Sequence, residues 1–488
     1  MTDILIVGGG IAGLSFGYES RIQGYDAEIV ERLEKVGGMC RSFVHNGCYL
    51  DVGVHLFYGN HPKVLKRAQE LIPADQWVKI NRNGNLYIKG RHIAWPLRLK
   101  SIVQFPFILG VKVFWEQLTS KKIDANGSSY ESEITSLYGR HLYDSFFGPF
   151  TKKFLKQNPR DIHCNWALAS IRAATKLENE KEETKYIGEK LDKETRNNFH
   201  LLGFLWKTLT SKREEEPFYY FKKGYGVLPD SYRDAFLNKG GRISVNQKIE
   251  ELITEEDRIV GCRINGEVKY FKHIVWTGML EQLCELLGEE KPNTKRLNSK
   301  FIYAFLKRSK RNHQVCYYAD ETLNTVRATL LNNQYQGIIQ NPKISDVVCL
   351  EYTYETRSDM EAIDQQAAED LAIKDLLKAD LVWSKDDVES MFQLNIPNSY
   401  PIFSLNYDKK IEQVKKNILN RYKNITLFGR QGNFSYENAD GIIQESIEHP
   451  FFQENSPESL KEKTSTQMKP SRNLMSHPVT PSHDISPV

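Results

Sequence analysis

The start of the chain alternates between short apolar runs and a glycine-rich segment. Residues 4–7 are apolar, residues 8–13 contain four glycines, residues 14–23 have helical spacing and residues 27–30 are apolar again. A strand, a tight turn, a helix and a second strand in this order are typical of the βαβ unit that binds a mononucleotide. We therefore expect the chain to open with two strands of a parallel sheet joined by a helix.

The rest of the chain alternates between helical and strand-like patterns. Residues 76–214 hold an aromatic-rich section and a charged stretch at 176–198, which predict a helical cap and a solvated helix pair or insertion. The pattern becomes β-rich again from residue 218, with strand patterns at 240–245, 259–264, 273–276, 300–355 and 425–428 and helices at 360–378 and 440–447. Residues 453–488 contain five prolines among polar residues, which predicts a disordered tail.

Composition excludes several classes of protein. The chain has 488 residues, of which 40% are apolar and 26% charged, so it is long enough for two or three cores and is not globally disordered. The chain has 66 lysines and arginines and 62 aspartates and glutamates, so its net charge is 66 − 62 = +4. This small net charge gives no signal for a nucleic-acid partner.

Cysteine usage and the chain's apolar runs bear on location. The seven cysteines show no Cys-x-x-Cys spacing, so we expect no metal site and no disulfide framework, and we predict a reducing, cytoplasmic location. Since residues 1–3 lead directly into the first apolar run, we expect no signal peptide. The apolar run at 102–115 is interrupted and too short to span a bilayer; we expect a helix packed on the core, with peripheral membrane contact left open.

The glycine spacing predicts a dinucleotide site. Gly8 allows the tight turn, Gly10 lets the backbone approach a pyrophosphate, and Gly13 lets helix and strand pack closely. The amides of Ile11, Ala12 and Gly13 begin the helix and face the phosphates. Glu31 follows the second strand, where its carboxylate can accept hydrogen bonds from the ribose hydroxyls.

The residues after this unit resemble a known clan of flavoproteins. Six positions carry the likeness here: Glu31, Arg32, Gly37, Gly38, Arg41 and Ser42, followed by the segment 51–57. The sequence is similar to the FAD-containing amine oxidase clan, which includes protoporphyrinogen oxidase, phytoene desaturase and UDP-galactopyranose mutase. The resemblance implies FAD as cofactor, with the second glycine pair and Arg41 lining its pyrophosphate and flavin.

Later segments extend the resemblance from residue 4 to about residue 447. Segment 222–229 resembles the stretch that re-enters the FAD domain, and Ile249 stands where the clan places a backbone contact to adenine. Segment 427–440, with Gly429, Arg430, Asn438 and Asp440, resembles the part that closes over the flavin.

The resemblance also implies the domain organisation. It is an α/β fold in which a Rossmann-like FAD-binding domain, a parallel sheet plus β-meander, is built from residues 1–75, 215–290 and 410–452. A discontinuous α+β substrate domain would take residues 76–214 and 291–409. Residues 453–488 would form the disordered tail.

The candidate catalytic residues come from the branch nearest the mutases. Residues 54–57 resemble the mutase segment whose histidine lies against the flavin, which makes His55 a candidate; a hydrogen-bonded structural histidine is the alternative. Arg430 is a candidate for contact with flavin or an anionic substrate. Tyr352 and Tyr400 either bind a sugar diphosphate or are core aromatics. Residues 436–440 depart from the mutase pattern, which puts assignment as a mutase in doubt.

Three functions remain open. The first is an FAD-dependent oxidoreductase acting in sugar or polysaccharide precursor biosynthesis. The second is a redox-neutral mutase that uses reduced FAD on a sugar nucleotide. The third is a flavin-binding protein without turnover. A small molecule such as a nucleotide sugar is the expected partner, and the sequence gives no oligomeric state.

Overall fold

The structure is a computed structural model that describes residues 2–454 apart from 82, 96, 98, 120–128, 168–217 and 357. The chain divides into two compact units, Met1–Ile447 and Glu448–Val488. In the second unit the described part is residues 448–454, which include helix α17 (Pro450–Glu454). The predicted charged helices at 176–198 and nearly all of the predicted tail lie outside the described residues.

The first sheet has a parallel part and an antiparallel part. Strand order is β10-β11-β12-β1-β2-β9, and β18 pairs with β12. The last six residues of β12 pair in parallel with β1, whereas its first four pair antiparallel with β11. The parallel strands are β1 (Thr2–Val7), β2 (Ala27–Val30), β9 (Arg242–Ser244), β12 (Glu267–Trp276) and β18 (Ile425–Leu427), and the meander adds β10 (Ile249–Glu255) and β11 (Arg258–Ile264). This is the predicted Rossmann-like sheet with its β-meander.

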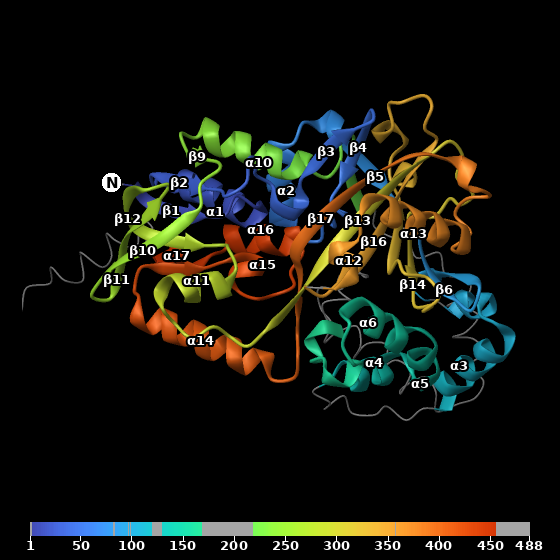
Figure 1. Ribbon diagram of the computed structural model, residues 1–488. Coiled ribbons are helices and arrows are strands. Elements are labelled where there is room, and N and C mark those ends of the chain that lie inside the picture. The colour runs from blue at the N-terminus through green and yellow to red at the C-terminus, as the bar shows by residue number, and fades with distance from the viewer. Residues whose placement is uncertain are drawn as a thin grey trace, which may run out of the picture. The chain divides into compact units, whose positions relative to one another are not determined.

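Helices from both ends of the chain cover the parallel strands. α1 packs against α10 and α16, and Figure 1 shows α1, in blue, beside the orange-red α15 and α16. Gly17 makes the close approach possible, because a Cβ there would lie 3.0 Å from Ile29 and 3.2 Å from Phe236. The helices of this region are α1 (Ile11–Ile22), α2 (Pro62–Leu71), α10 (Val227–Asn238), α11 (Leu280–Leu287), α14 (Tyr407–Arg421), α15 (Gly429–Gly432) and α16 (Ala439–Ile447).

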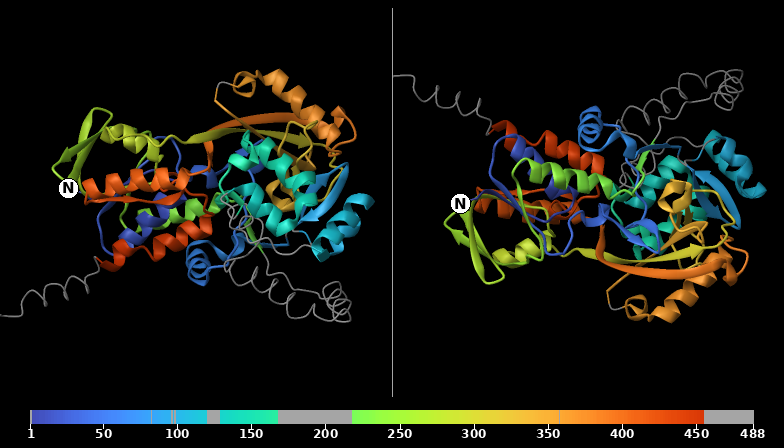
Figure 2. Two further views of the ribbon diagram at one scale, coloured as in Figure 1. Left: turned by 90° about the horizontal axis from the view of Figure 1, so that it is seen from below. Right: turned by 90° about the horizontal axis from the view of Figure 1, so that it is seen from above.

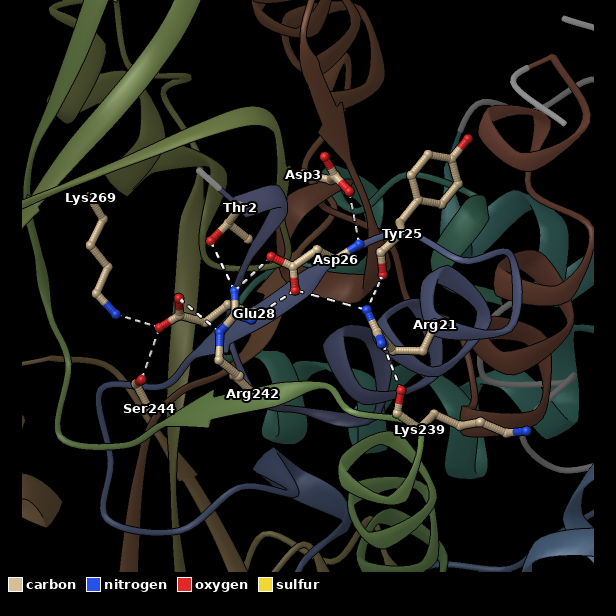
Figure 3. A network of polar contacts seen from close by, with 10 residues as sticks. All are labelled: Thr2, Asp3, Arg21, Tyr25, Asp26, Glu28, Lys239, Arg242, Ser244 and Lys269. Carbon is tan, nitrogen blue, oxygen red and sulfur yellow. Dashed lines mark hydrogen bonds and ion pairs between the residues drawn. The ribbon is translucent and has the colours of Figure 1, made fainter. Parts of the chain in front are cut away.

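A polar network joins the edge strand β9 to its neighbour β2 (Figure 3). The Arg242 guanidinium donates to both carboxylate oxygens of Asp26, at 2.7 and 3.0 Å. Glu28 accepts from the Ser244 hydroxyl at 2.9 Å and forms an ion pair with Lys269. The bidentate arginine pair fixes the geometry of this edge. It lies at the starts of β2 and β9, whereas the glycine turn follows the end of β1, at the opposite ends of the strands.

The second sheet is mixed, in the order β17-β13-β16-β15-β14-β6-β7. β14 and β6 pair in parallel and the other neighbours pair antiparallel. Its strands are β6 (Gly84–Ile88), β7 (Arg91–Trp95), β13 (Lys295–Leu306), β14 (Val315–Tyr318), β15 (Arg327–Leu330), β16 (Asp346–Tyr354) and β17 (Val388–Ile402). β16 is buried along its whole length, as expected for a strand covered on both faces.

Different helices cover the two faces of this sheet, and the left view of Figure 2 shows them on opposite sides. Helix α13 lies on one face, where Ala372 and Leu376 pack against Ile302 and Leu350. The other face carries α3 (Phe107–Thr119), α4 (Tyr130–Tyr138), α5 (Arg140–Leu142), a π-helix (Tyr143–Phe147) and α6 (Gly148–Leu155).

The helix predicted at 360–378 is two helices, α12 (Asp359–Ala362) and α13 (Gln365–Lys378). The break has a local cause, because the Asp364 carboxylate accepts a hydrogen bond from the Ala367 amide at 2.8 Å. This contact is an N-cap, and it starts a new helix.

Helix α3 begins inside the apolar run at 102–115 and extends beyond it to Thr119. Its buried Leu109 and Val113 pack on the core, whereas Phe107, Ile108 and Trp115 are 83%, 70% and 66% exposed. The predicted packing on the core therefore involves one face of the helix. Among the described residues, no helix combines the length and the apolar character needed to cross a membrane.

The two sheets draw their strands from the two sets of segments predicted as domains. One pairing crosses between the sets: β5 (Trp77–Ile80) is antiparallel to β8 (Phe218–Phe221). A further hairpin consists of β3 (Ser42–His45) and β4 (Cys48–Asp51). Short 3-10 turns complete the unit at Gly38–Cys40, Ala74–Gln76, Leu99–Gln104, Pro159–Asp161, Leu331–Asn333, Gln336–Ile338 and Lys385–Asp387. The exact domain boundaries stay a prediction.

Candidate functional site

The turn between β1 and α1 needs glycine for a different reason at each motif position. Gly8 has φ +105°, and a Cβ there would lie 2.4 Å from the Thr277 hydroxyl oxygen. A Cβ at Gly13 would lie 1.9 Å from the Gly8 carbonyl oxygen, so this position closes the helix onto the strand. At Gly10 the nearest atom to a Cβ is Gly38 Cα, 4.0 Å away. Packing within the chain therefore demands glycine at positions 8 and 13, and not at position 10.

The first turn of α1 offers backbone donors beside Gly10. Gly10 is the N-cap of the helix and no side chain caps it. The first intrahelical bond runs from the Leu14 amide to the Gly10 carbonyl at 2.9 Å. The preceding amides, those of Ile11, Ala12 and Gly13, have no carbonyl one turn earlier in the helix. With the helix dipole they make an anion site.

The second glycine pair lies directly against the first turn. The Gly37 amide donates to the Gly9 carbonyl at 2.7 Å, and Gly37 and Gly38 have φ of +107° and +55°. The Arg41 guanidinium donates to the Gly38 carbonyl at 2.8 Å, and burial lowers the pKa of Arg41. The structure thus brings these predicted residues together, whereas Arg32 is exposed.

Glu31 is tied to the glycine turn by both of its carboxylate oxygens. One oxygen accepts from the Gly9 amide at 2.7 Å and the other from the Leu33 amide at 2.9 Å. Each oxygen keeps a further acceptor site for a ribose hydroxyl. The Glu31 carbonyl also accepts from the Gln247 amide at 2.8 Å, which places Ile249, the first residue of β10, close to the end of β2.

Replacement of Glu31 with glutamine should weaken cofactor retention. An amide group would put an N–H donor opposite the Gly9 or the Leu33 amide, and one acceptor for ribose would be lost. We expect the dissociation constant for FAD to rise about 10-fold or more, which corresponds to at least ~1.4 kcal/mol. Fluorescence titration measures it, with the exposed Glu256→Gln as control. Tighter binding in Glu31→Gln would contradict the ribose role.

The C-terminal segment packs on the first turn of α1. Gly429 has φ +72°, and a Cβ there would lie 2.5 Å from the Ala12 Cβ. The Asp440 carboxylate accepts from the amides of Tyr58 and Gly59 at 3.2 and 2.9 Å and so holds the loop after His55. The Asn438 carbonyl accepts from the Ile442 amide at 3.1 Å at the start of α16. The two ends of the unit therefore meet at one place, as the motifs predict.

Arg430 is a half-buried residue with two enclosed guanidinium nitrogens. Its Cζ atom lies 4.0 Å from the centre of the Tyr436 ring, a cation–π contact. Its Nε and Nη2 atoms are buried, and within the described residues they have no hydrogen-bond partner. Burying guanidinium nitrogens without hydrogen bonds is costly in an isolated chain. Such nitrogens can bind an anion.

His55 is a neutral ring inside the same region. It stacks on Tyr225 with ring centres 4.9 Å apart and planes 24° apart. Its Nδ1 atom is buried and has no hydrogen-bond partner among the described residues. Burial, then the charges of Arg327 and Arg430, lower the pKa of His55 to about 3. At neutral pH the ring is therefore uncharged, and it can donate or accept one hydrogen bond.

The lowered pKa of His55 predicts a pH-dependent contribution to stability. The unfolded chain protonates this ring near pH 6.5 and the folded chain only near pH 3. Acidification between these values therefore favours unfolding. Relative to His55→Gln, the wild type should lose roughly 1 kcal/mol of unfolding free energy for each pH unit below 6.5. Denaturant titrations from pH 8 to 4 measure this, and parallel curves would contradict it.

Asp51 organises the backbone around the predicted Ser42. Its buried carboxylate accepts from the hydroxyls of Ser42 and Tyr220 and, at 2.9 Å, from the Tyr225 amide. Ser42 in turn accepts from the Gly226 amide at 2.6 Å. The Ser42 hydroxyl thus joins the β3–β4 hairpin to the segment that carries Tyr225, and a direct contact to the cofactor stays a prediction.

Replacement of Asp51 with asparagine should destabilise this junction. One of the carboxylate oxygens would become an N–H donor facing buried donors, with an expected loss of about 2–3 kcal/mol in unfolding free energy. Urea denaturation measures it. The exposed Asp257→Asn should change the value by less than about 0.5 kcal/mol, and an equal effect in both variants would contradict the assignment.

A buried polar cluster on the second sheet faces the Arg430 ring stack. Arg327 on β15 forms an ion pair with Glu351 on β16. The Tyr400 hydroxyl donates to Glu351 at 2.8 Å, and its ring stacks on Tyr436 with centres 6.2 Å apart. Tyr400 is therefore in the candidate site. Sequence patterns gave no sign of Arg327 or Glu351, because strand pairing brings them together. Tyr436 lies in the segment before α16.

Tyr352 does not belong to this cluster, which corrects its selection as a candidate. Side chains alternate along a strand, so Tyr352 and its neighbour Glu351 point to opposite faces of β16. Tyr352 packs with Ile302, Ala372 and Leu376 under α13. Of the two sequence alternatives, core aromatic or ligand contact, the structure places it in the core.

Comparisons with known proteins agree with this geometry. Residues 6–71 match the model of the NAD(P)-binding Rossmann-like domain. The chain is 26% identical over 171 residues to the "Probable UDP-galactopyranose mutase" of Klebsiella pneumoniae, covering 33% of this chain and 42% of that protein. The chain spans about half the length of the curated relatives it matches.

Solved structures share the fold over nearly the whole chain. A reduced UDP-galactopyranose mutase covers 96% of this chain and 99% of its own, with TM-score 0.72 and 16% identity. Cyclohexylamine oxidase from Brevibacterium oxydans covers 95% of this chain and 99% of its own, with TM-score 0.57 and 11% identity. The fold is therefore that of the mutase and amine oxidase structures, and the expectation drawn from the resemblance is confirmed at this level.

Proposed function

We propose that this protein is an FAD-dependent enzyme that acts on an anionic small molecule. The observation that carries the proposal is the Arg430 guanidinium, whose buried Nε and Nη2 lack partners among the described residues beside the glycine turn. The space at Gly10 is open in the same region, since no atom lies within 4.0 Å of a Cβ except Gly38 Cα at that distance. Both features fit an extended anionic cofactor and its substrate.

The residues fit FAD along its length. The amides of Ile11, Ala12 and Gly13 would hold the pyrophosphate, together with the Gly37–Gly38 loop. Glu31 would take the adenosine ribose and the backbone of Ile249 the adenine. Gly429 and Arg430, with Asn438 and Asp440 behind them, would line the flavin. FAD supplies the electron transfer when bound, and the protein supplies position and electrostatics.

The chain's own groups define what the substrate side can do. Arg430 would bind a carboxylate or phosphate oxygen and orient it against the stacked Tyr436 and Tyr400 rings. The Arg327–Glu351 pair is electrically balanced and would fix the Tyr400 hydroxyl. His55 is neutral, so it would place one ring N–H or one ring nitrogen at the site without adding charge. These roles support an oxidoreductase as the leading function.

A redox-neutral sugar-nucleotide mutase is the second candidate. The comparison with UDP-galactopyranose mutase in both sequence and fold favours it. The free donors of Arg430 suit a nucleotide diphosphate equally well. A role in sugar or polysaccharide precursor biosynthesis follows from this candidate, and a cytoplasmic location stays a prediction.

An anaerobic assay with purified flavin-loaded protein separates the candidates. Sugar nucleotides and primary amines are added in turn, and the flavin absorbance is followed. Bleaching by a substrate without another reductant supports the oxidoreductase. Product formation only after dithionite reduction, with no net consumption of electrons, supports the mutase. If no compound of either class changes absorbance or is converted, the third reading, a flavin-binding protein without turnover, replaces both.

A further inference from the structure

Two histidines and a cysteine meet inside the second sheet, on the face covered by α13. His92 lies on β7, Cys316 on β14, and His313 in the segment before β14. Strand β6 separates β7 from β14, and cross-strand pairs put Tyr87 opposite His92 and Tyr318 opposite Tyr87. The three residues are unrelated in sequence spacing, so the search for metal motifs along the chain does not find them.

The ligand-bearing atoms of this cluster are close and buried. They all lie within 4.8 Å of one another, and His92 Nδ1 lies 3.6 Å from Cys316 Sγ. The imidazole rings are 5.3 Å apart between centres. His313 is 2% exposed and Cys316 is fully buried. The Nε2 atoms of both histidines are buried and have no hydrogen-bond partner within the part of the chain that the structure describes.

These distances are near those of a metal site. Zinc–sulfur and zinc–nitrogen bonds of about 2.3 and 2.0–2.1 Å in tetrahedral geometry separate the sulfur and nitrogen ligands by roughly 3.5 Å. The observed 3.6 Å between His92 Nδ1 and Cys316 Sγ matches that edge. No separation within the cluster exceeds 4.8 Å, so at most about 1 Å of closure is required, which rotation of an imidazole ring supplies.

We propose that His92, His313 and Cys316 form a binding site for one zinc ion, with a fourth position left to water or a neighbouring group. Imidazole and thiolate ligands suit this ion and exclude calcium and magnesium. The ion would join β7, the segment before β14 and β14 itself, so its role would be to stabilise this end of the sheet. The site is separate from the flavin site and does not depend on the proposed function.

Zinc binds the neutral form of imidazole and the thiolate form of cysteine. Burial raises the pKa of Cys316 to about 12. Binding of Zn²⁺ therefore forms a zinc–sulfur bond, breaks the S–H bond and releases one proton to solvent. Arg311 is itself paired with Asp380, which reduces its repulsion of the ion.

The test uses the full-length, reduced, untagged protein with its flavin. After addition of Zn²⁺ and dialysis against a weak chelator, elemental analysis should give one zinc per chain, and zinc should raise Tm. Co²⁺ in place of zinc should give a thiolate-to-cobalt charge-transfer band. Absence of stoichiometric zinc, or bound cobalt without that band, would overturn the proposal.

Variants locate the ion. Cys316→Ser and His313→Gln should weaken zinc binding by more than the ~10- to 100-fold that loss of an outer-sphere contact causes. Cys284→Ser, a buried cysteine on α11, should bind zinc as the wild type does. Far-UV circular dichroism reports folding in each variant, and the less buried His92→Gln serves if the other two fail to fold. Retention of zinc by all three ligand variants would place it elsewhere and refute the site.

Discussion

Gly10→Val should give a folded chain that no longer retains FAD. Apart from its chain neighbours, a Cβ at Gly10 meets no atom of the described residues nearer than 4.0 Å, and Gly10 has φ −72°, which valine adopts without strain. The added methyl groups would instead occupy the space where the backbone must approach the pyrophosphate. We expect affinity for FAD to fall by ~1,000-fold or more, about 4 kcal/mol, while Tm of the cofactor-free protein changes little.

Two matched glycine variants separate binding from folding. Gly13→Ala places its Cβ 1.9 Å from the Gly8 carbonyl oxygen and should prevent folding as well as binding. Gly24→Asn, at φ +88° with no atom within 4 Å, should alter neither, since asparagine tolerates the left-handed region. Absorbance at the flavin band and thermal melts measure both properties. A yellow Gly10→Val protein with normal occupancy would refute the placement of the pyrophosphate.

Arg430→Met should stabilise the ligand-free protein and disable it. Methionine keeps much of the side-chain length and removes a charge whose buried Nε and Nη2 have no partner among the described residues. Removing an uncompensated buried charge favours folding. In a complex with an anionic substrate, loss of the Arg430 charge should weaken binding by about 3–4 kcal/mol, so kcat/KM should fall by roughly 100- to 1,000-fold. The two effects have opposite signs.

Controls for Arg430 test the charge and its geometry. Arg430→Lys keeps the charge without the forked donors and should recover part of the activity. The exposed Arg91→Met should change neither property by much. Thermal melts without ligand and steady-state kinetics give the two readouts. Arg430→Met that melts lower than the wild type and keeps its kcat/KM would show that the guanidinium is structural.

The local part of the fold could be predicted from the sequence because its causes are local. Gly8, Gly10 and Gly13 are separated by a few residues, and steric limits at these positions follow from the turn itself. The parallel start of the sheet and the meander follow from apolar runs and alternation. The meeting of Gly429 with Ala12 could be inferred only through family resemblance, since no short-range pattern joins the two ends of the unit.

The parts that sequence reasoning missed depend on strand pairing and register. Arg327 and Glu351 lie on β15 and β16 and are opposite each other in the register of the sheet. Glu351 and Tyr352 are neighbours on β16, so their side chains point to opposite faces of the sheet. Glu351 faces the candidate site and Tyr352 faces α13. Aromatic character alone cannot decide between these faces, so the sequence could not tell that Tyr352 faces α13 whereas the Tyr400 hydroxyl contacts Glu351.

The most direct measurement is an equilibrium titration of the purified, cofactor-free chain with FAD, NAD and NADP in parallel. One FAD should bind per chain with a change in the flavin spectrum, and the Gly10→Val protein should show no such change at the same concentrations. A chain that ignores FAD and takes up a nicotinamide dinucleotide in stoichiometric amount would contradict the account of the site at its foundation.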